Sequence, residues 1–311
     1  MIRDVPIARV TPDDEAIEDM RFLITGARGM MGRALSAQAE EQGHEVWPTD
    51  IERLAHDPQD RIDVTDAAGL DRAVANFRPD AVFHLAAMTQ VDDCEKRPEE
   101  AYAINAVGTR NVALLCRRHE LDLVYISTGS IFAGSKPTPY HEFDDPAPAS
   151  VYARSKWAGE VAVRELVPHH YVVRAGWMFG GGAEDKKFVA KMIELARGRD
   201  VLRAVDDKFG SPCYTRDISR RCLELLQTGH YGTFHAANDG MCSRYEMARA
   251  IVEFAGVRDC RVDPCSSAEF PLPAPRPRME AMDGLHARLI GLRPQPHWRD
   301  ALRDYIETVL L

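Results

Sequence analysis

The chain has 311 residues, of which 45% are hydrophobic, and its formal net charge is −9. This length suits one large domain or two smaller ones, and the apolar share is ordinary for a globular protein. The negative charge gives no electrostatic support for binding to nucleic acid or to an anionic membrane. No apolar run approaches the length of a membrane span, and the first residues lack the apolar stretch of a signal peptide.

Seven cysteines are scattered along the chain, and no two of them have the CxxC spacing of a zinc or redox site. Their odd number argues against a disulfide framework, so we expect reduced thiols in a cytoplasmic protein. No cluster of histidines and carboxylates has the spacing of metal ligands, and we expect no metal site.

The first strong motif is a glycine-rich turn that runs from Gly26 to Gly32. It follows an apolar run at 21–25, which predicts a buried strand, and it precedes a helical pattern at 31–42. Gly26 permits the tight turn, Gly29 lets the backbone approach a pyrophosphate, and Gly32 lets helix and strand pack closely. This order of strand, glycine turn and helix predicts a dinucleotide site, with phosphate at the helix N-terminus.

The residues around the next predicted strand, at 45–48, leave the choice between NAD and NADP open. Asp50 lies 18 residues after Gly32, where a carboxylate accepts hydrogen bonds from the adenosine ribose, which favours NAD. A turn or helix-capping aspartate is the alternative interpretation. Arg28 favours NADP instead, because a basic residue in the turn can pair with a 2′-phosphate.

Strand and helix patterns alternate from residue 21 to about residue 175, which predicts a parallel sheet with helices on both faces. The predicted strands are 21–25, 45–48, 80–85, 122–127 and 170–175. The predicted helices are 31–42, 66–77 (with Thr65 as its N-cap), 98–119 and 150–166. The fold class is therefore α/β, a Rossmann-like doubly wound sheet.

Three parts are expected along the chain: an N-terminal extension at 1–20, a Rossmann domain at 21–175, and a smaller, mainly helical substrate-binding region at 176–311. The extension is acidic and reads equally as a tail, a cap or a partner-binding arm. The last region has predicted helices at 185–197, 215–227, 243–255 and 297–309, and a proline-rich extended segment at 271–277. Ligands of open parallel sheets lie at the carboxyl ends of the strands, so this region is expected to cover that crevice.

The strongest catalytic motif is Tyr152 followed four residues later by Lys156. Residues at this spacing share one face of a helix. The tyrosine can give a proton to a carbonyl oxygen during hydride transfer, and the lysine charge is expected to lower the tyrosine pKa. Ser127 and Thr128 end a predicted strand, where a hydroxyl can hold the same carbonyl oxygen, with a turn role as the alternative.

Other candidates keep two interpretations each. Small residues at Leu85-Ala86-Ala87 suit close approach of a dinucleotide or simple close packing. Asn105 sits within a predicted helix, where it either braces the site or bonds locally. Trp177 either packs on a sugar ring or belongs to the core. Arg276 either binds a diphosphate or is a solvated surface arginine.

These motifs together resemble the extended short-chain dehydrogenase/reductases, and more narrowly the dTDP-4-dehydrorhamnose reductase branch. The resemblance covers roughly residues 21 to 311. The segments that carry it are Gly26–Gly32, His84–Asp92, Asn105–Thr109, Ser127-Thr128, Val151–Lys156, Val173–Trp177, Gly210–Pro212, Thr215–Ile218, Arg276–Arg278 and Trp298–Leu302.

The resemblance implies reduction of a nucleotide-linked 4-keto sugar with NADPH or NADH, in a protein that pairs as a homodimer. It implies a catalytic set of Thr128, Tyr152 and Lys156. The cofactor contacts it assigns, joined to those reasoned above, are Gly26, Arg28, Gly29, Met30, Met31, Gly32, Asp50, Asp63, Val64, Leu85, Ala86, Ala87, Asn105, Tyr152 and Lys156. The substrate contacts are Thr89, Val91, Gly129, Ser130, Trp177 and Arg276.

Two positions depart from the pattern of this branch. An aspartate and a tyrosine usually follow the catalytic threonine, whereas Gly129 and Ser130 stand there, so sugar contacts are expected to be lost. Glu280 stands where a small polar residue is more usual. The identity of the sugar therefore stays open.

Two alternative functions remain. An epimerase needs only the tyrosine–lysine pair and a tightly held oxidised cofactor. A non-catalytic nucleotide-binding subunit, similar to the regulatory subunit of methionine adenosyltransferase, would tolerate the drift at Gly129-Ser130. A dehydratase is disfavoured, because Gly129 and Ser130 supply no acid or base.

Overall fold

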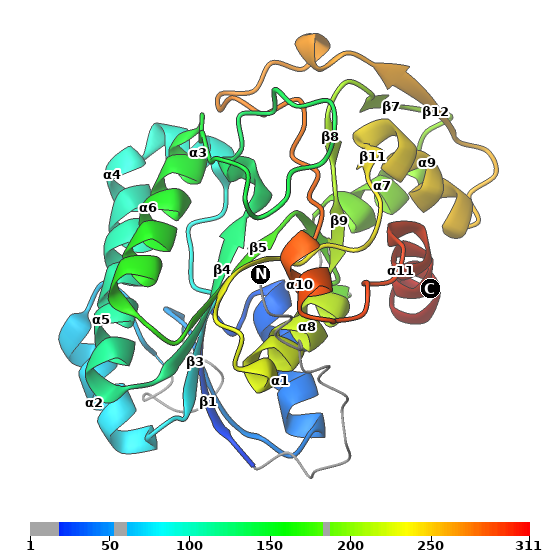
Figure 1. Cartoon of the computed structure of the whole chain (residues 1–311). Helices are drawn as coiled ribbons and strands as arrows, with labels where there is room; N and C mark the ends of the chain where they lie inside the picture. Colours follow the sequence, from blue (N-terminus) through cyan, green and yellow to red (C-terminus); the bar gives the residue numbers. More distant parts are fainter. Residues whose placement is uncertain (1–18, 53–60, 183–186) are drawn as a thin grey trace, which may run out of the picture.

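The protein is described by a computed structural model covering residues 19–52, 61–182 and 187–311 (Figure 1). Six parallel strands form the central sheet in the order β10-β5-β4-β3-β1-β2. Chain order reverses between β1 and β3, and such a switch point is where open parallel sheets bind ligands. The strands are β1 (Arg21–Thr25), β2 (Glu45–Thr49), β3 (Ala81–His84), β4 (Asp122–Thr128), β5 (His170–Ala175) and β10 (Gly232–His235).

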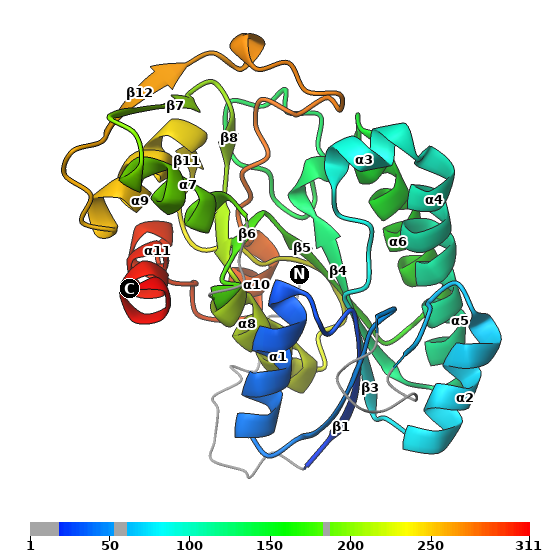
Figure 2. The same ribbon diagram turned by 180° about the vertical axis from the view of Figure 1, so that it is seen from behind.

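Helices cover both faces of the sheet (Figure 2). One face packs on α1 (Met30–Glu41) and α8 (Thr215–Thr228), and the other on α2 (Ala67–Phe77), α5 (Thr109–His119) and α6 (Val151–Leu166). The inner strands are almost continuously apolar and buried, as expected of parallel strands with helices on both sides. The predicted α/β, doubly wound fold is confirmed.

The rest of the chain forms a second part beside the carboxyl ends of the strands, at the upper right of Figure 1. Its core is built around α7 (Phe188–Arg197), α9 (Arg244–Phe254) and α11 (Trp298–Tyr305), which continues as a π-turn at Ile306–Leu310. Its short strands pair as β6 (Trp177–Phe179) with β9 (Pro212–Tyr214), β7 (Val201–Val205) with β12 (Arg261–Cys265), and β8 (Phe209–Gly210) with β11 (Cys242–Ser243). A short α10 (Leu285–Leu289) lies on β10.

The two parts interleave along the chain. α8 and β10 both lie beyond residue 175, yet α8 packs on α1 and β10 is the sixth strand of the sheet. The expected N-terminal extension lies outside the described residues up to residue 18. In the described ranges, no helix is both long and apolar enough to cross a bilayer.

The continuous helix expected at 98–119 is wrong. The structure divides it into α4 (Pro98–Tyr102), a π-turn at Ala103–Gly108 and α5, after the short α3 (Val91–Lys96). α6 packs so closely here that a Cβ on Gly159 would lie 2.4 Å from the carbonyl oxygen of Asn105. π-turns often occur at functional sites, and Asn105 lies within this one.

The expected N-cap of α2 is also wrong. The cap position is Asp66, while the hydroxyl of Thr65 donates to Asp63 Oδ1 at 2.7 Å. The Thr65 hydroxyl is thus bound to a local carboxylate, and the helix begins one residue later than expected.

Gly159→Ala tests this close approach. The added methyl group would also lie 2.8 Å from the hydroxyl oxygen of Tyr125, so we expect a loss of about 1–3 kcal/mol of unfolding free energy, measured by denaturant titration. The matched control is Gly198→Ala at the end of α7, where an added Cβ meets no atom within 4 Å. Equal stability of the two variants would contradict the packing described.

Candidate active site

The glycine-rich turn lies at the switch point, between the ends of β1 and β3. Gly26 has a φ of +74°, and a Cβ there would lie 2.6 Å from the backbone nitrogen of Ala86. A Cβ on Gly32 would lie 2.5 Å from the Cα of Ala27. Both positions therefore require glycine, which brings the turn against the strand end after β3.

The N-terminus of α1 fits an anionic group. Gly29 is its N-cap residue and provides no side chain to cap the first N–H groups, which begin at Met30. These N–H groups and the positive end of the helix dipole favour a phosphate. The turn itself is held by Asp50, whose Oδ2 accepts a hydrogen bond from the backbone nitrogen of Arg28 at 3.0 Å.

A cavity of about 390 Å³ runs from this turn to α6, within the size range of small-molecule and cofactor sites. A dinucleotide fits its chemistry, with phosphate-binding backbone at one end and hydroxyl and ammonium groups at the other. The described residues that line it are Gly26, Arg28, Gly29, Met30, Met31, Gly32, Arg33, Leu85, Ala87, Thr89, Gln90, Ile126, Ser127, Tyr152, Lys156, Met178, Gly181 and Lys187.

Several expected cofactor residues are not part of this lining. Asp50 holds the turn, and Asp63 accepts bonds from the backbone and hydroxyl of Thr65 at 2.8 and 2.7 Å. The Val64 side chain packs against Gly108. Direct contact of these residues with a cofactor stays a prediction. Arg28 does line the cavity, and it forms an ion pair with Glu52 at 3.0 Å.

The catalytic set is brought together by β4 and α6. α6 starts after Ser150, whose hydroxyl oxygen accepts from Ala153 N at 3.1 Å. This places Tyr152 in the first turn and Lys156 one turn later. Thr128 ends β4 and accepts from Ser130 N at 3.1 Å, and its hydroxyl lies close enough to the Tyr152 phenol to act on the pKa of that group. Tyr152 lines the cavity and Thr128 lies beside it, and two hydroxyls in this arrangement can bind one carbonyl oxygen.

Burial controls the proton chemistry of this set. It raises the pKa of Tyr152 to about 12, while the neighbouring Thr128 hydroxyl acts to lower it. The expected lowering of this pKa by Lys156 is wrong, because desolvation of the phenol dominates. Burial also lowers the pKa of Lys156 to about 7, against the opposing charge of Glu160. The phenol is therefore neutral at physiological pH, which is the form that donates a proton.

A buried ion pair fixes α6 on the sheet. The guanidinium of Arg174 on β5 holds both carboxylate oxygens of Glu160, with Nε to Oε2 at 3.1 Å, and both side chains are buried. Ser127 donates to the same Oε2 at 2.9 Å, so its hydroxyl is engaged by Glu160. Thr128 is then the strand-end hydroxyl left beside Tyr152.

Asn105 braces the loop after β3. Its side-chain oxygen accepts from Met88 N at 2.8 Å, and its nitrogen donates to Met88 O at 3.1 Å and to Ser155 Oγ at 3.0 Å. The bracing interpretation is therefore supported by the contacts. It ties the Leu85–Ala87 loop to α6 without lining the cavity.

The expected substrate residues have different surroundings. Thr89 lines the cavity. Ser130 and Trp177 both bind Glu280, through Ser130 Oγ to Oε2 at 2.6 Å and Trp177 Nε1 to Oε1 at 2.8 Å. Arg276 pairs with Asp92 at 3.1 Å, beside Val91 at the start of α3, while Gly129 packs against the residue 280–282 segment.

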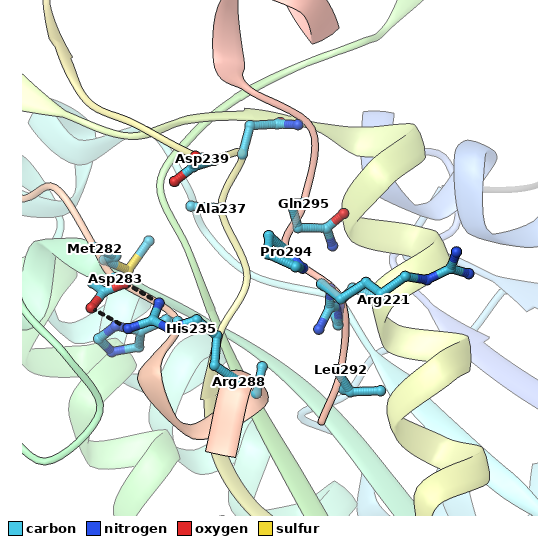
Figure 3. A pocket seen from close by; sticks show the side chains of 14 residues that line it. Arg221, His235, Ala237, Asp239, Met282, Asp283, Arg288, Leu292, Pro294 and Gln295 are labelled. Carbon is cyan, nitrogen blue, oxygen red and sulfur yellow. Dashed lines mark hydrogen bonds and ion pairs between the residues drawn. The ribbon is translucent and has the colours of Figure 1, made fainter. Parts of the chain in front are cut away.

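A second cavity, of about 60 Å³, lies between α8 and the α10 region (Figure 3). It is too small for a dinucleotide, since small-molecule and cofactor sites measure about 300–1,000 Å³. Two of its polar side chains are engaged nearby: Arg288 pairs with Asp283, and the His235 Nε2 lies 3.3 Å from Arg174 Nη1. The larger cavity is therefore the candidate site.

Sequence reasoning missed Glu160 and Arg244, and it noted Glu280 only as a departure. Arg244 lies with its guanidinium 3.5 Å from the centre of the Trp177 ring. Arg244 and Glu280 have no local spacing signal, because each meets its partners only through the fold. For Glu160, the spacing of four from Lys156 on one helix face was the available signal.

Comparison with known proteins covers both parts of the chain. The family model described as RmlD substrate binding domain matches residues 20–311. The dTDP-4-dehydrorhamnose reductase of Mycolicibacterium smegmatis is 41% identical over 292 residues, which are 93% of this chain and 86% of that protein. A crystal structure of a dTDP-4-dehydrorhamnose reductase from Clostridium acetobutylicum has a TM-score of 0.88 at 35% identity and covers 94% of this chain and 100% of its own. That from Bacillus anthracis, in complex with NADP, has a TM-score of 0.87 at 36% identity and covers 93% and 100%.

The pKa of Lys156 predicts a pH dependence of cofactor binding. With a pKa of about 7 in the free protein, the lysine loses its charge as pH rises through neutrality. The ammonium is the form that binds ribose hydroxyls, so we expect affinity for NADPH to fall above about pH 7.

Fluorescence titration with NADPH across this pH range measures the effect. Lys156→Met should lower affinity by about 10-fold or more below neutrality and remove this component of the pH dependence. The same slope in wild type and variant would assign it to another group.

Proposed function

The chain belongs to the RmlD substrate binding domain family, and from this membership we propose that it reduces the 4-keto group of a dTDP-activated deoxysugar. It is an NAD(P)-dependent oxidoreductase. The observation that carries the proposal is the position of Tyr152, beside Thr128, in the wall of the cavity that the glycine-rich turn bounds.

The residues of the site divide the work of reduction. When bound, the reduced nicotinamide supplies the hydride that adds to the carbonyl carbon. The hydroxyls of Thr128 and Tyr152 hold the carbonyl oxygen and stabilise the negative charge that develops on it. Tyr152 gives its phenolic proton to that oxygen, so the C=O group becomes C–OH. The Lys156 ammonium, one helical turn away, stabilises the phenolate until water returns the proton.

We propose NADPH as the preferred donor. Arg28 and Arg33 both line the cavity at the glycine-rich turn, where a 2′-phosphate needs a cationic partner. The carboxylate of Asp50 is engaged with the Arg28 backbone nitrogen, which supports a role in shaping the turn.

We also propose a cytoplasmic location. All seven cysteines are buried and free, and burial raises the pKa of each thiol. Unpaired thiols of this kind suit a reducing compartment.

The function is tested with NADPH or NADH and a panel of dTDP-linked 4-keto sugars, by the absorbance of the reduced cofactor. Oxidation of the cofactor with one of these sugars is the expected result. Cofactor binding without any oxidation across the panel would contradict it.

Tyr152→Phe tests the proton donor. The variant keeps the ring and its packing, so NADPH affinity should change little while turnover falls by about 100-fold or more. Tyr102→Phe, at an exposed tyrosine of α4, is the matched control and should be as active as wild type. Normal turnover by Tyr152→Phe would overturn the mechanism.

Arg28→Ala and Asp50→Ala test cofactor choice. Loss of the Arg28 charge should weaken NADPH by about 10-fold or more and leave NADH nearly unchanged. Loss of the Asp50 carboxylate frees the turn, so it should weaken both cofactors to a similar extent. A selective loss of NADH in Asp50→Ala would assign Asp50 to the ribose hydroxyls instead.

A further inference from the structure

A second group of polar side chains lies beside Tyr152, outside the lining of the dinucleotide cavity. We call Ser130, Trp177, Arg244 and Glu280 the Glu280 cluster. Ser130 Oγ and Trp177 Nε1 donate to the two oxygens of Glu280 at 2.6 and 2.8 Å. The charge of Glu280 acts to raise the pKa of Tyr152, so this carboxylate lies within electrostatic reach of the proton donor.

The backbone holds Glu280 in place. Its N–H donates to Phe209 O at 2.9 Å, the carbonyl of Ala281 accepts from Tyr140 N at 2.8 Å, and Met282 N donates to Ser211 Oγ at 3.0 Å. The segment is thus bound on both sides. Its carboxylate is presented from a fixed backbone, which favours selective recognition.

Gly129 explains how this segment comes so close to Thr128. A Cβ at position 129 would lie 3.0 Å from the carbonyl oxygen of Glu280 and 3.0 Å from Met282 Sδ. Any side chain there would press on the segment. Gly129, Ser130 and Glu280 therefore form one arrangement. The missing side chain of Gly129 lets the segment that carries Glu280 approach, and the Ser130 hydroxyl holds the Glu280 carboxylate.

Arg244 adds a positive charge to the cluster. Its guanidinium lies 3.5 Å from the centre of the Trp177 ring and 4.9 Å from that of Phe188, and it forms no ion pair with any residue of the described ranges. Burial lowers its pKa to about 10, and the charge of Glu280 opposes this shift. The arginine therefore stays charged at neutral pH and stabilises the negative charge of Glu280.

The carboxylate keeps capacity for a ligand. Each oxygen of Glu280 accepts one hydrogen bond from the protein, and a carboxylate oxygen can accept two. The remaining positions accept only, so they suit a hydroxyl donor. Among the groups of a 4-keto sugar bound at Thr128 and Tyr152, the ring hydroxyl next to the carbonyl is such a donor.

We propose that Glu280 is a specificity-determining residue, which accepts a hydrogen bond from a ring hydroxyl adjacent to the reacting carbonyl of the sugar. The inference rests on the proposed function and narrows it. The substrate keeps a hydroxyl next to its keto group, and sugars deoxygenated at that carbon are poor substrates.

Binding of dTDP-sugar ligands tests the proposal without requiring turnover. Affinity is measured by calorimetry for a dTDP-6-deoxysugar and for its analogues that lack one ring hydroxyl. The proteins are wild type and Glu280→Gln, with thermal melting to verify folding. Glu253→Gln, at an exposed glutamate paired with Arg299 at 3.0 Å, is the matched control.

One analogue should bind wild type about 10- to 100-fold more weakly than its parent, as expected for a lost bond to an ionised group. Glu280→Gln replaces the ionised acceptor with a neutral amide, so it should bind the parent more weakly than wild type does and should lose less affinity on deoxygenation, because both changes weaken the same interaction. Ser130→Ala, which frees the carboxylate, should have a smaller effect of the same kind. NADPH affinity should be unchanged in both variants.

The opposite result is full additivity. If Glu280→Gln weakens every ligand by the same factor, Glu280 only supports the fold of the site and the proposal is wrong. Turnover of the parent keto sugar by wild type separates this from the function itself. If wild type reduces the keto sugar but the effects of Glu280→Gln and of deoxygenation are additive, the proposed role of Glu280 is wrong and the proposed function stands. If the two effects are coupled but no turnover occurs, the proposed reductase function is wrong and Glu280 is still a sugar-binding residue.

Discussion

The buried pair of Glu160 and Arg174 is the interaction on which the site depends. It joins α6 to β5 and, through Ser127, to the end of β4. Burying such a pair is costly, and removing one partner would leave an uncompensated charge in the core. In return, the helix that carries Tyr152 and Lys156 has a fixed position relative to Thr128. Positioning at this accuracy is what allows two hydroxyls to meet one carbonyl oxygen.

Burial also decides the protonation of the catalytic groups. The same packing that holds α6 removes water from Tyr152 and Lys156, so the phenol stays protonated and the lysine pKa falls toward neutrality. The Tyr152 phenol therefore carries its proton before any ligand binds. Lys156 can change between its neutral and charged forms near neutral pH, and an anionic or hydroxyl-rich ligand beside it would favour the charged form.

Local motifs made much of this architecture predictable. The turn from Gly26 to Gly32 and the pair Tyr152 and Lys156 are encoded in short spacings, and the structure places them along one cavity. The π-turn around Asn105 was not predictable, because it depends on how closely Gly159 of another helix approaches. Glu280 meets Ser130 across 150 residues of chain, and the sequence marked both positions as unusual without showing that they are in contact. The pKa of Tyr152 likewise depends on burial, which no spacing reveals.

The most direct measurement is isotopic. The protein is incubated with NADPH that carries deuterium in place of both hydrogens at the transferring carbon and with a dTDP-linked 4-keto deoxysugar, and the product is examined by mass spectrometry and NMR. The account predicts one deuterium, bound to the sugar carbon that held the keto group. A product without deuterium, or one changed in configuration at a neighbouring carbon with the keto group intact, would contradict it.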